Sequence, residues 1–391
     1  MSVVVGGATS VVLPRPGGGT VRHRPNDPGP WTRPAGPFRE RIAYAAAHVA
    51  ADARGANAPG APAAVDWGAT MAFRRHLWSY GFGVAEAMDT AQRGMGLDWS
   101  ATRTLITRSA REARAVGGAI AAGAGTDHMP AARTLEEIRC AYAEQVAFVQ
   151  DAGATVILMA SRQLAAVARS PLEYHEVYAP LIEMADRPVI LHWLGPMFDP
   201  ALTGYWGSGD IADAADSVLT LIAQHPGRVD GIKVSLLDAA LERQVRDRLP
   251  AGVRLYTGDD YNYPELIRDE GGRHSDALLG VFAAIAPAAS TALQALDRGD
   301  LAGFDALGAT TALARHLFAP PTQYYKTGIA FLAWLSGHQR GFTMVGGLQS
   351  GRSVLHLAEA YRLADELGLF AEPERAARRV AAFLQVAGID Q

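Results

Sequence analysis

Lys233 ends a short apolar segment, Val-Asp-Gly-Ile-Lys, at residues 229–233. A lysine at the end of a buried parallel strand points into a medium of low dielectric constant. Such a medium disfavours the ammonium and leaves a nucleophilic amine near neutral pH. An amine of this kind attacks carbonyl carbons and forms imines. The structural alternative is a lysine that reaches the rim of the fold or pairs with a carboxylate, and the surrounding residues favour the chemical interpretation.

The segments on either side of Lys233 form an ordered pattern. An apolar strand carries His192 near its end, the next strand ends in Gly-Ile-Lys, the next in Gly-Asp-Asp, and a Gly-Gly pair precedes a last apolar strand, at residues 188–193, 229–233, 253–260, 271–272 and 277–283. This order resembles the dihydrodipicolinate synthase and N-acetylneuraminate lyase family of Schiff-base (β/α)8 enzymes. The resemblance extends roughly over residues 42–369. It includes residues 320–328 and 346–352, which are similar to the C-terminal helical segments of that family.

The resemblance implies that Lys233 forms the imine, and two departures bear on the substrate. His192 stands where the family has a tyrosine that relays a proton to the reacting carbonyl. After the second strand, where the family has Gly-Thr-Thr-Gly-Glu around the carboxylate of a 2-oxo acid, this chain has Asp-Thr-Ala-Gln-Arg-Gly at residues 89–94. We therefore expect His192 to be the general acid/base, since an imidazole has an ordinary pKa of about 6.5. Asp89 and Thr90 would bind the polar end of a sugar-like substrate in preference to pyruvate.

Alternation of strands and helices predicts a parallel sheet, and its length suits a (β/α)8 TIM barrel. The expected domains are an N-terminal β-hairpin arm at 1–40, a catalytic barrel at 41–290 and a C-terminal helical region at 291–391. Pro-Gly-Gly-Gly at residues 16–19 marks the hairpin turn. The hairpin would cover one end of the barrel or make oligomer contacts. The eight barrel strands are predicted at residues 42–49, 83–88, 119–122, 155–160, 189–193, 229–233, 254–257 and 278–283.

Chemistry in such barrels lies at the carboxyl ends of the strands. We therefore expect Lys233 and His192 to be catalytic. The expected substrate-binding residues are the polar side chains near the other strand ends: His48, Glu86, Asp89, Thr90, His128, Asp259, Asp260 and Tyr261. The alternative is that Glu86 pairs with a cation. If that cation were Lys233, the pairing would raise the pKa of Lys233 and oppose imine formation.

Two further functions use the same residues differently. Six of them could hold a divalent metal, with Lys233 stabilising an enolate, in a lyase or isomerase that acts on a sugar: His48, Glu86, Asp89, His128, His192 and Asp259. Their spacing matches no ligand motif, so the leading prediction has neither metal nor cofactor. The other alternative is a sugar-binding barrel without catalysis.

Composition limits the partners. The chain has 391 residues, of which 49% are hydrophobic, so it can bury a large core as one barrel. A net charge of −4 provides no electrostatic attraction to nucleic acid or to an anionic membrane. One cysteine, Cys140, allows no internal disulfide and suits a reducing cytoplasm. We expect a cytoplasmic homo-oligomer, dimer or tetramer, that acts on a small molecule.

Overall fold

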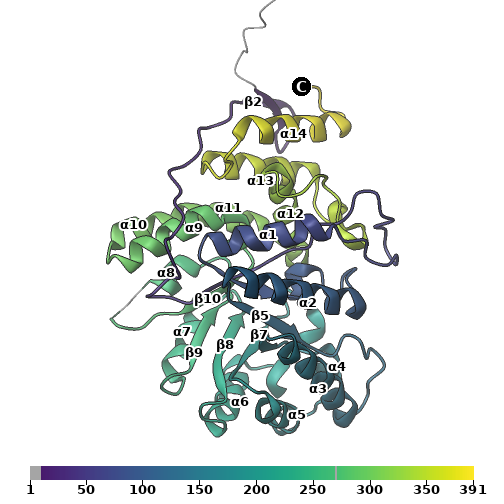
Figure 1. Ribbon diagram of the computed structural model, residues 1–391, viewed down its shortest axis with the longest axis vertical. Coiled ribbons are helices and arrows are strands. Elements are labelled where there is room, and N and C mark those ends of the chain that lie inside the picture. Colours follow the sequence, from purple (N-terminus) through teal and green to yellow (C-terminus); the bar gives the residue numbers. More distant parts are fainter. Residues whose placement is uncertain (1–9, 269–270) are drawn as a thin grey trace, which may run out of the picture.

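The computed structural model describes residues 10–268 and 271–391, and its centre is a closed barrel of parallel strands (Figure 1). The strands follow one another around the barrel in chain order, and the last pairs with the first. A (β/α)8 barrel is therefore confirmed. The strands are β3 (Ala43–Ala46), β4 (Gly83–Glu86), β5 (Ile120–Ala124), β6 (Thr155–Leu158), β7 (Val189–Leu194), β8 (Val229–Ser235), β9 (Arg254–Thr257) and β10 (Asp276–Leu279).

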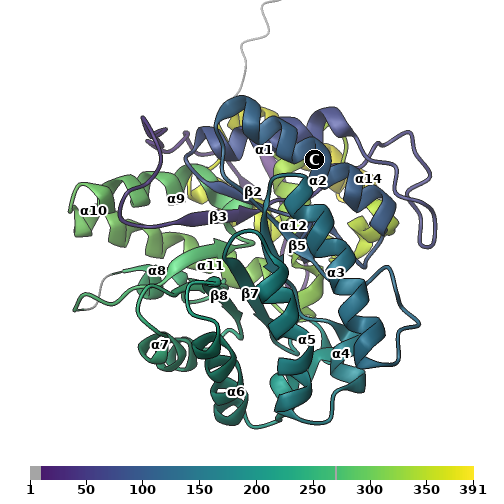
Figure 2. The ribbon, with the colours of Figure 1, turned by 60° about the horizontal axis from the view of Figure 1, so that its bottom comes forward.

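Helices between the strands form the outer layer, as Figure 2 shows for α3, α5, α6 and α7. Most begin at an acidic or hydroxyl side chain that accepts a hydrogen bond from the first turn, for example Asp66 before α1 and Thr134 before α3. These helices are α1 (Trp67–Ser79), α2 (Trp99–Val116), α3 (Leu135–Asp151), α4 (Arg162–Val167), α5 (Pro171–Met184), α6 (Ile211–Gln224), α7 (Ala239–Arg248) and α8 (Tyr263–Ile267).

The barrel interior is filled largely by small and branched apolar side chains. They come from seven of the strands: Ala46, Ala85, Ala121, Ile157, Ile190, Tyr256 and Leu278. On β8 the same face carries Gly231, where a Cβ would lie 2.7 Å from the ring of Tyr256. The next inward position on β8 is Lys233, because successive side chains alternate between the faces of a strand. These apolar side chains thus fill the barrel interior below Lys233.

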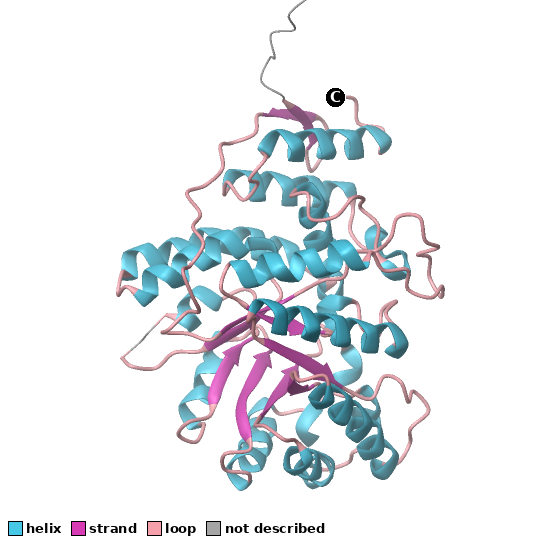
Figure 3. Ribbon diagram, in the orientation of Figure 1, coloured by secondary structure: helices cyan, strands magenta, loops and turns pink. Residues whose placement is uncertain are grey.

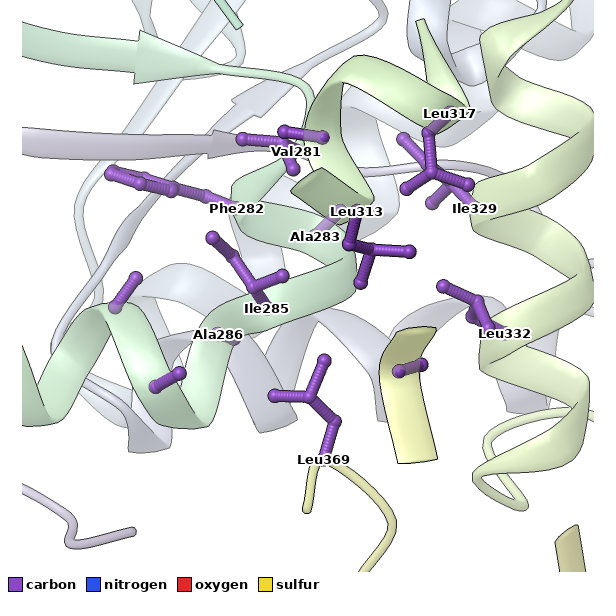
Figure 4. Packing of buried hydrophobic residues seen from close by; sticks show 14 of the residues in the cluster. Val281, Phe282, Ala283, Ile285, Ala286, Leu313, Leu317, Ile329, Leu332 and Leu369 are labelled. Carbon is purple, nitrogen blue, oxygen red and sulfur yellow. The ribbon is translucent and has the colours of Figure 1, made fainter. Parts of the chain in front are cut away.

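The chain after the barrel is helical and packs beside it, in the upper half of Figure 3. Its elements are α9 (Phe282–Asp297), α10 (Leu301–Asp305), α11 (Thr311–Leu317), α12 (Tyr325–Leu335), α13 (Val354–Glu366) and α14 (Pro373–Val386). Figure 4 shows Phe282 and Ile285 of α9 in one apolar cluster with Leu313 of α11 and Leu332 of α12. This cluster fixes α12 relative to the barrel.

The predicted hairpin consists of β1 (Val11–Pro14) and β2 (Thr20–His23), which pair antiparallel. It does not cover the barrel: β1 contacts α13 and α14, at the top of Figure 1. His23 and Asn26 hydrogen bond to the buried Asp365 of α13. The chain then runs down along the helical region to β3. Whether the arm also makes oligomer contacts stays a prediction.

The predicted strands differ from the observed ones mainly at their ends. The fifth and seventh were expected at 189–193 and 254–257, where β7 and β9 lie. The first, expected at 42–49, ends at Ala46, and the eighth, expected at 278–283, is Asp276–Leu279. The eighth ends early because Asp260 accepts a hydrogen bond from the backbone N–H of Val281, where the chain turns into α9.

Candidate active site

Lys233 lies inside the carboxyl end of the barrel. It is in register with His192 on β7 and with Tyr256 on β9. A Cβ at Gly258 would lie 2.8 Å from Lys233 Cε and 2.1 Å from Ser235 Oγ. Glycine at this position therefore makes room for the lysine side chain.

Burial lowers the pKa of Lys233 below its ordinary value, against the opposing charge of Asp89 and, when it is ionised, of Asp260. The side chain is almost fully buried. Within residues 10–268 and 271–391, no hydrogen bond or ion pair to its Nζ is found. Desolvation without a bound counter-ion favours the neutral amine, which is the nucleophilic form.

His192 faces the same interior as Lys233, and its Nε2 lies 3.3 Å from Ser235 Oγ. Burial and the charge of Lys233 hold its pKa well below 6.5, against the opposing effect of Asp89. The imidazole is therefore neutral at physiological pH. In that state it can accept a proton from a substrate or donate its single N–H.

Asp89 and Thr90 begin a short 3-10 turn, Asp89–Ala91, after β4. Asp89 Oδ2 accepts a 2.7 Å hydrogen bond from Tyr325 on α12, and the Thr90 hydroxyl contacts the same phenol. Burial alone would raise the pKa of Asp89, but Lys326, Lys233 and Tyr325 together lower it. Asp89 is thus an ionised carboxylate electrostatically coupled to two lysines.

The turn after β9 carries Asp259, Asp260 and Tyr261. Asp259 accepts hydrogen bonds from Asn262 and from the backbone of Tyr261, so it shapes the turn. The phenol of Tyr261 donates to the backbone of Phe318. Burial raises the pKa of Asp260 to about 8, and Asp260 is electrostatically coupled to Lys233. Asp260 therefore carries a proton at neutral pH near the reactive amine.

A cavity of about 280 Å³ has Asp89 in its wall, whereas Lys233, His192 and Asp260 are not among its lining residues. Its wall comes from the segments after β4, β5, β6 and β7, and from Lys326 of α12. Met159, Leu194 and Phe198 form apolar parts of the wall. The polar part includes Asp89, Thr126, Ser161, Arg162, Gln163, Gln323 and Lys326.

Sequence reasoning missed Tyr325 and Lys326 as site residues. They follow the barrel by more than forty positions and begin α12, whose docking brings them to Asp89. One signal was present in the sequence. The chain has 36 lysine and arginine residues, and only Lys233 and Lys326 are lysines.

Three expected substrate ligands point elsewhere. Glu86 forms a fully buried ion pair with Arg74 of α1, at 2.8 Å, on the outer face of β4. The cation that pairs with Glu86 is therefore Arg74 and not Lys233. His48 hydrogen bonds to Gln339 and packs on Phe73, and burial lowers its pKa to about 3.

His128 lies against α3, where its Nδ1 is 2.7 Å from Gln145 and its Nε2 is 3.1 Å from Glu144. Its ring also packs on Trp99. The six side chains considered as metal ligands are therefore spread over the inside and outside of the barrel. In the described parts of the chain, no group of three or more His, Cys, Asp or Glu side chains is placed to hold a metal ion.

One family model covers nearly the whole chain, at residues 11–389, and its description is "Protein of unknown function (DUF993)". The chain belongs to this family. A search of curated proteins by sequence finds no match to this DUF993 member. Its described helices include none that is both long and apolar enough to cross a bilayer.

Solved structures of dihydrodipicolinate synthase share the fold of this DUF993 chain. The enzyme from Aquifex aeolicus is 13% identical with a TM-score of 0.62, and the enzyme from Thermotoga maritima is 14% identical with a TM-score of 0.62. The enzyme from Acinetobacter baumannii, complexed with pyruvate, is 17% identical with a TM-score of 0.61. Each match covers 84% of this chain and 99% of the other. The expected resemblance is thus confirmed at the level of the fold.

Proposed function

We propose that this protein is a lyase of the class I aldolase type, in which Lys233 forms an imine with a carbonyl substrate. The observation that supports it most is the buried amine of Lys233, whose pKa is lowered at the carboxyl end of a barrel with the aldolase fold. Catalytic groups of this fold gather at that end.

The reaction begins when Lys233 Nζ attacks the carbonyl carbon of the substrate and forms a carbinolamine. Loss of water gives an iminium, which accepts the electron pair of the C–C bond that breaks and becomes an enamine, while the detached fragment leaves as an aldehyde or ketone. Protonation of the enamine and addition of water release the product and restore the amine. No electrons enter or leave the cycle.

The neighbouring groups can supply its proton transfers. Asp260, with its pKa raised to about 8, holds a proton that can go to the departing hydroxyl of the carbinolamine. His192 is neutral and can take the proton of a substrate hydroxyl when a C–C bond breaks. Asp89 stabilises the cationic iminium by its charge.

The substrate is a hydroxylated keto acid or a sugar derivative. Hydroxyl and amide side chains, Thr126, Ser161, Gln163 and Gln323, line the cavity, and they suit substrate hydroxyls. Asp89 occupies the turn after β4 and would repel a carboxylate placed next to the reacting carbonyl. We also propose that the protein acts as a homo-oligomer in the cytoplasm.

Borohydride trapping tests the imine directly. The protein is incubated with a set of hydroxylated ketones and 2-oxo acids, reduced, digested and examined by mass spectrometry. With a true substrate, the peptide that carries Lys233 should gain the mass of the reduced adduct, and Lys233→Met should gain none. Arg103→Met, on the exposed face of α2 and outside the cavity, is the control, and it should still be trapped. Adducts on Lys326 alone, or on neither lysine with any compound, would contradict the proposal.

A further inference from the structure

Both lysines of this chain lie in the candidate active site. All other basic side chains among its 36 lysine and arginine residues are arginines. Lys233 and Lys326 are buried, and the charge of Asp89 acts on both. The proposed reaction uses Lys233 as the nucleophile and assigns no role to Lys326.

Lys326 is held by its surroundings with its ammonium at the cavity. Its Nζ donates to the backbone carbonyl of Asp89 and lies 3.5 Å from Met95 Sδ. The same side chain forms part of the cavity wall. An ammonium has three N–H donors, and a backbone carbonyl and a thioether are both uncharged partners.

The acidic side chains around the cavity are already engaged. Asp127 pairs with Arg93 at 2.7 Å, Asp199 pairs with Arg162 at 2.5 Å, and Asp89 accepts from Tyr325. Within the part of the chain that the structure describes, Lys326 makes no ion pair with a carboxylate. A buried cation without a bound counter-ion is costly, and an anion that enters the cavity would offset that cost.

We propose that Lys326 binds an anionic group of the substrate, a carboxylate or a phosphate, within this cavity. The group is separated from the reacting carbonyl by hydroxylated carbons, because a carboxylate next to the carbonyl would meet Asp89. Hydroxyls of the intervening carbons face Thr126, Ser161 and Gln163. The claim that the bound molecule also reacts at Lys233 rests on the proposed function. The claim that Lys326 binds an anion does not.

Lysine suits this place better than arginine. Its ammonium is a compact charge that fits between a backbone carbonyl and a thioether, whereas a guanidinium needs a planar set of acceptors. The pKa of Lys326 is lowered to about 8, mainly by burial, with Asp89 opposing the shift and Arg162 adding to it. A bound anion should reverse that shift by stabilising the ammonium.

The test exploits the two lysines. Protein labelled with 13Cε-lysine gives two resonances, which Lys326→Met and Lys326→Arg assign, and each is titrated with pH. Inorganic phosphate and acetate are added separately, at constant ionic strength. With at least one of them, the pKa of Lys326 should rise by about one unit, a tenfold change in its protonation constant. That of Lys233 should rise less.

Calorimetry with the same anions supplies a second measurement. Lys326→Met should lose binding, and Arg103→Met should keep it, because Arg103 is exposed on α2 and lies outside the cavity. The acetate and phosphate arms show which anion is preferred. If neither anion moves the Lys326 resonance of the wild-type protein, or if Arg103→Met loses binding equally, the anion site is wrong. Anion binding without any borohydride adduct would instead overturn the imine and leave the anion site standing.

Discussion

Charge balance at individual residues controls what the site can do. Asp89 is ionised and His192 is neutral, and Asp260, with a pKa of about 8, is protonated at neutral pH. All three act on Lys233 or are acted on by it. A single buried cluster thus holds a nucleophile, a base and an acid at the same pH, which imine chemistry requires.

Replacing His192 tests the proton transfer. His192→Phe should lower turnover of a trapped compound by ~10²–10⁴, because a lost acid/base costs that much, while the borohydride adduct still forms. Since the pKa of His192 lies well below 6.5, we expect no loss of wild-type activity on acidification near pH 6.5 from this group. Steady-state kinetics across pH measures both. His175→Phe, on α5 outside the cavity, is the control. Near-normal turnover in His192→Phe would move the role to another group.

Asp89 should make pyruvate a poor ligand. If the carbonyl of pyruvate is placed at Lys233, its carboxylate lies close to the ionised Asp89. Juxtaposed like charges cost several kcal/mol. Calorimetry should show weak pyruvate binding, tightened in Asp89→Thr. Ser161→Ala, which leaves the charge unchanged, serves for comparison. Tight binding by the wild-type protein, unaffected by Asp89→Thr, would remove Asp89 from the site.

At the level of elements, α7 supports the turn that carries Asp259 and Asp260. Glu242 of α7 is fully buried and accepts hydrogen bonds from Thr257 of β9 and from Ser275. The Thr257 hydroxyl in turn accepts from the backbone N–H of Asp259. Burial raises the pKa of Glu242 to about 8. A protonated carboxyl therefore joins α7 to the carboxyl end of β9 and to Ser275, which immediately precedes β10.

Glu242 should make stability depend on pH. Its folded-state pKa of about 8 exceeds the ordinary 4.5, so its contribution is complete below pH 4.5 and is lost as the pH rises toward 8. The loss can reach about 1.4 kcal/mol per pH unit. Urea unfolding at several pH values should show a flatter dependence for Glu242→Gln than for the wild type. The exposed Glu176→Gln should behave as the wild type. If the free energy of unfolding changed equally with pH in all three proteins, the raised pKa of Glu242 would be refuted.

Sequence patterns predicted the strands better than the direction of their side chains. Strands of a parallel barrel are apolar on both faces, so a polar residue such as Glu86 gives no sign of whether it points inward. Lys233 and His192 were recognisable because the neighbouring strand ends formed an ordered pattern. Lys326 was not, because helical periodicity in the tail does not reveal which barrel loop a helix will meet.

For the whole molecule, the hairpin joins the two ends of the chain. Val11 and Leu13 are buried against the helical region, and Gln391 hydrogen bonds to the backbone of Val12. No described residue before β3 lines the cavity. The hairpin therefore contributes to stability without touching the chemistry.

Two neighbouring valines test this contribution. Val11→Asp should lower the free energy of unfolding by about 2–4 kcal/mol, because it places a carboxylate in an apolar contact and removes a buried side chain. Val12, on the half-buried opposite face, should tolerate aspartate with a much smaller loss. Denaturant unfolding measures both. Borohydride trapping on Lys233 should persist in each folded variant, and equal losses for the two valines would argue against the docked hairpin.

The docking of β1 on α13 and α14 also sets an order of events during synthesis. The hairpin leaves the ribosome before the barrel, and its partners α13 and α14 are made after the barrel. At 5–20 residues per second, tens of seconds separate the two. Over that interval the apolar side chains of Val11 and Leu13 lack their native partners and stay exposed to solvent. A chaperone that binds short apolar segments could therefore bind the hairpin before any part of the barrel is complete.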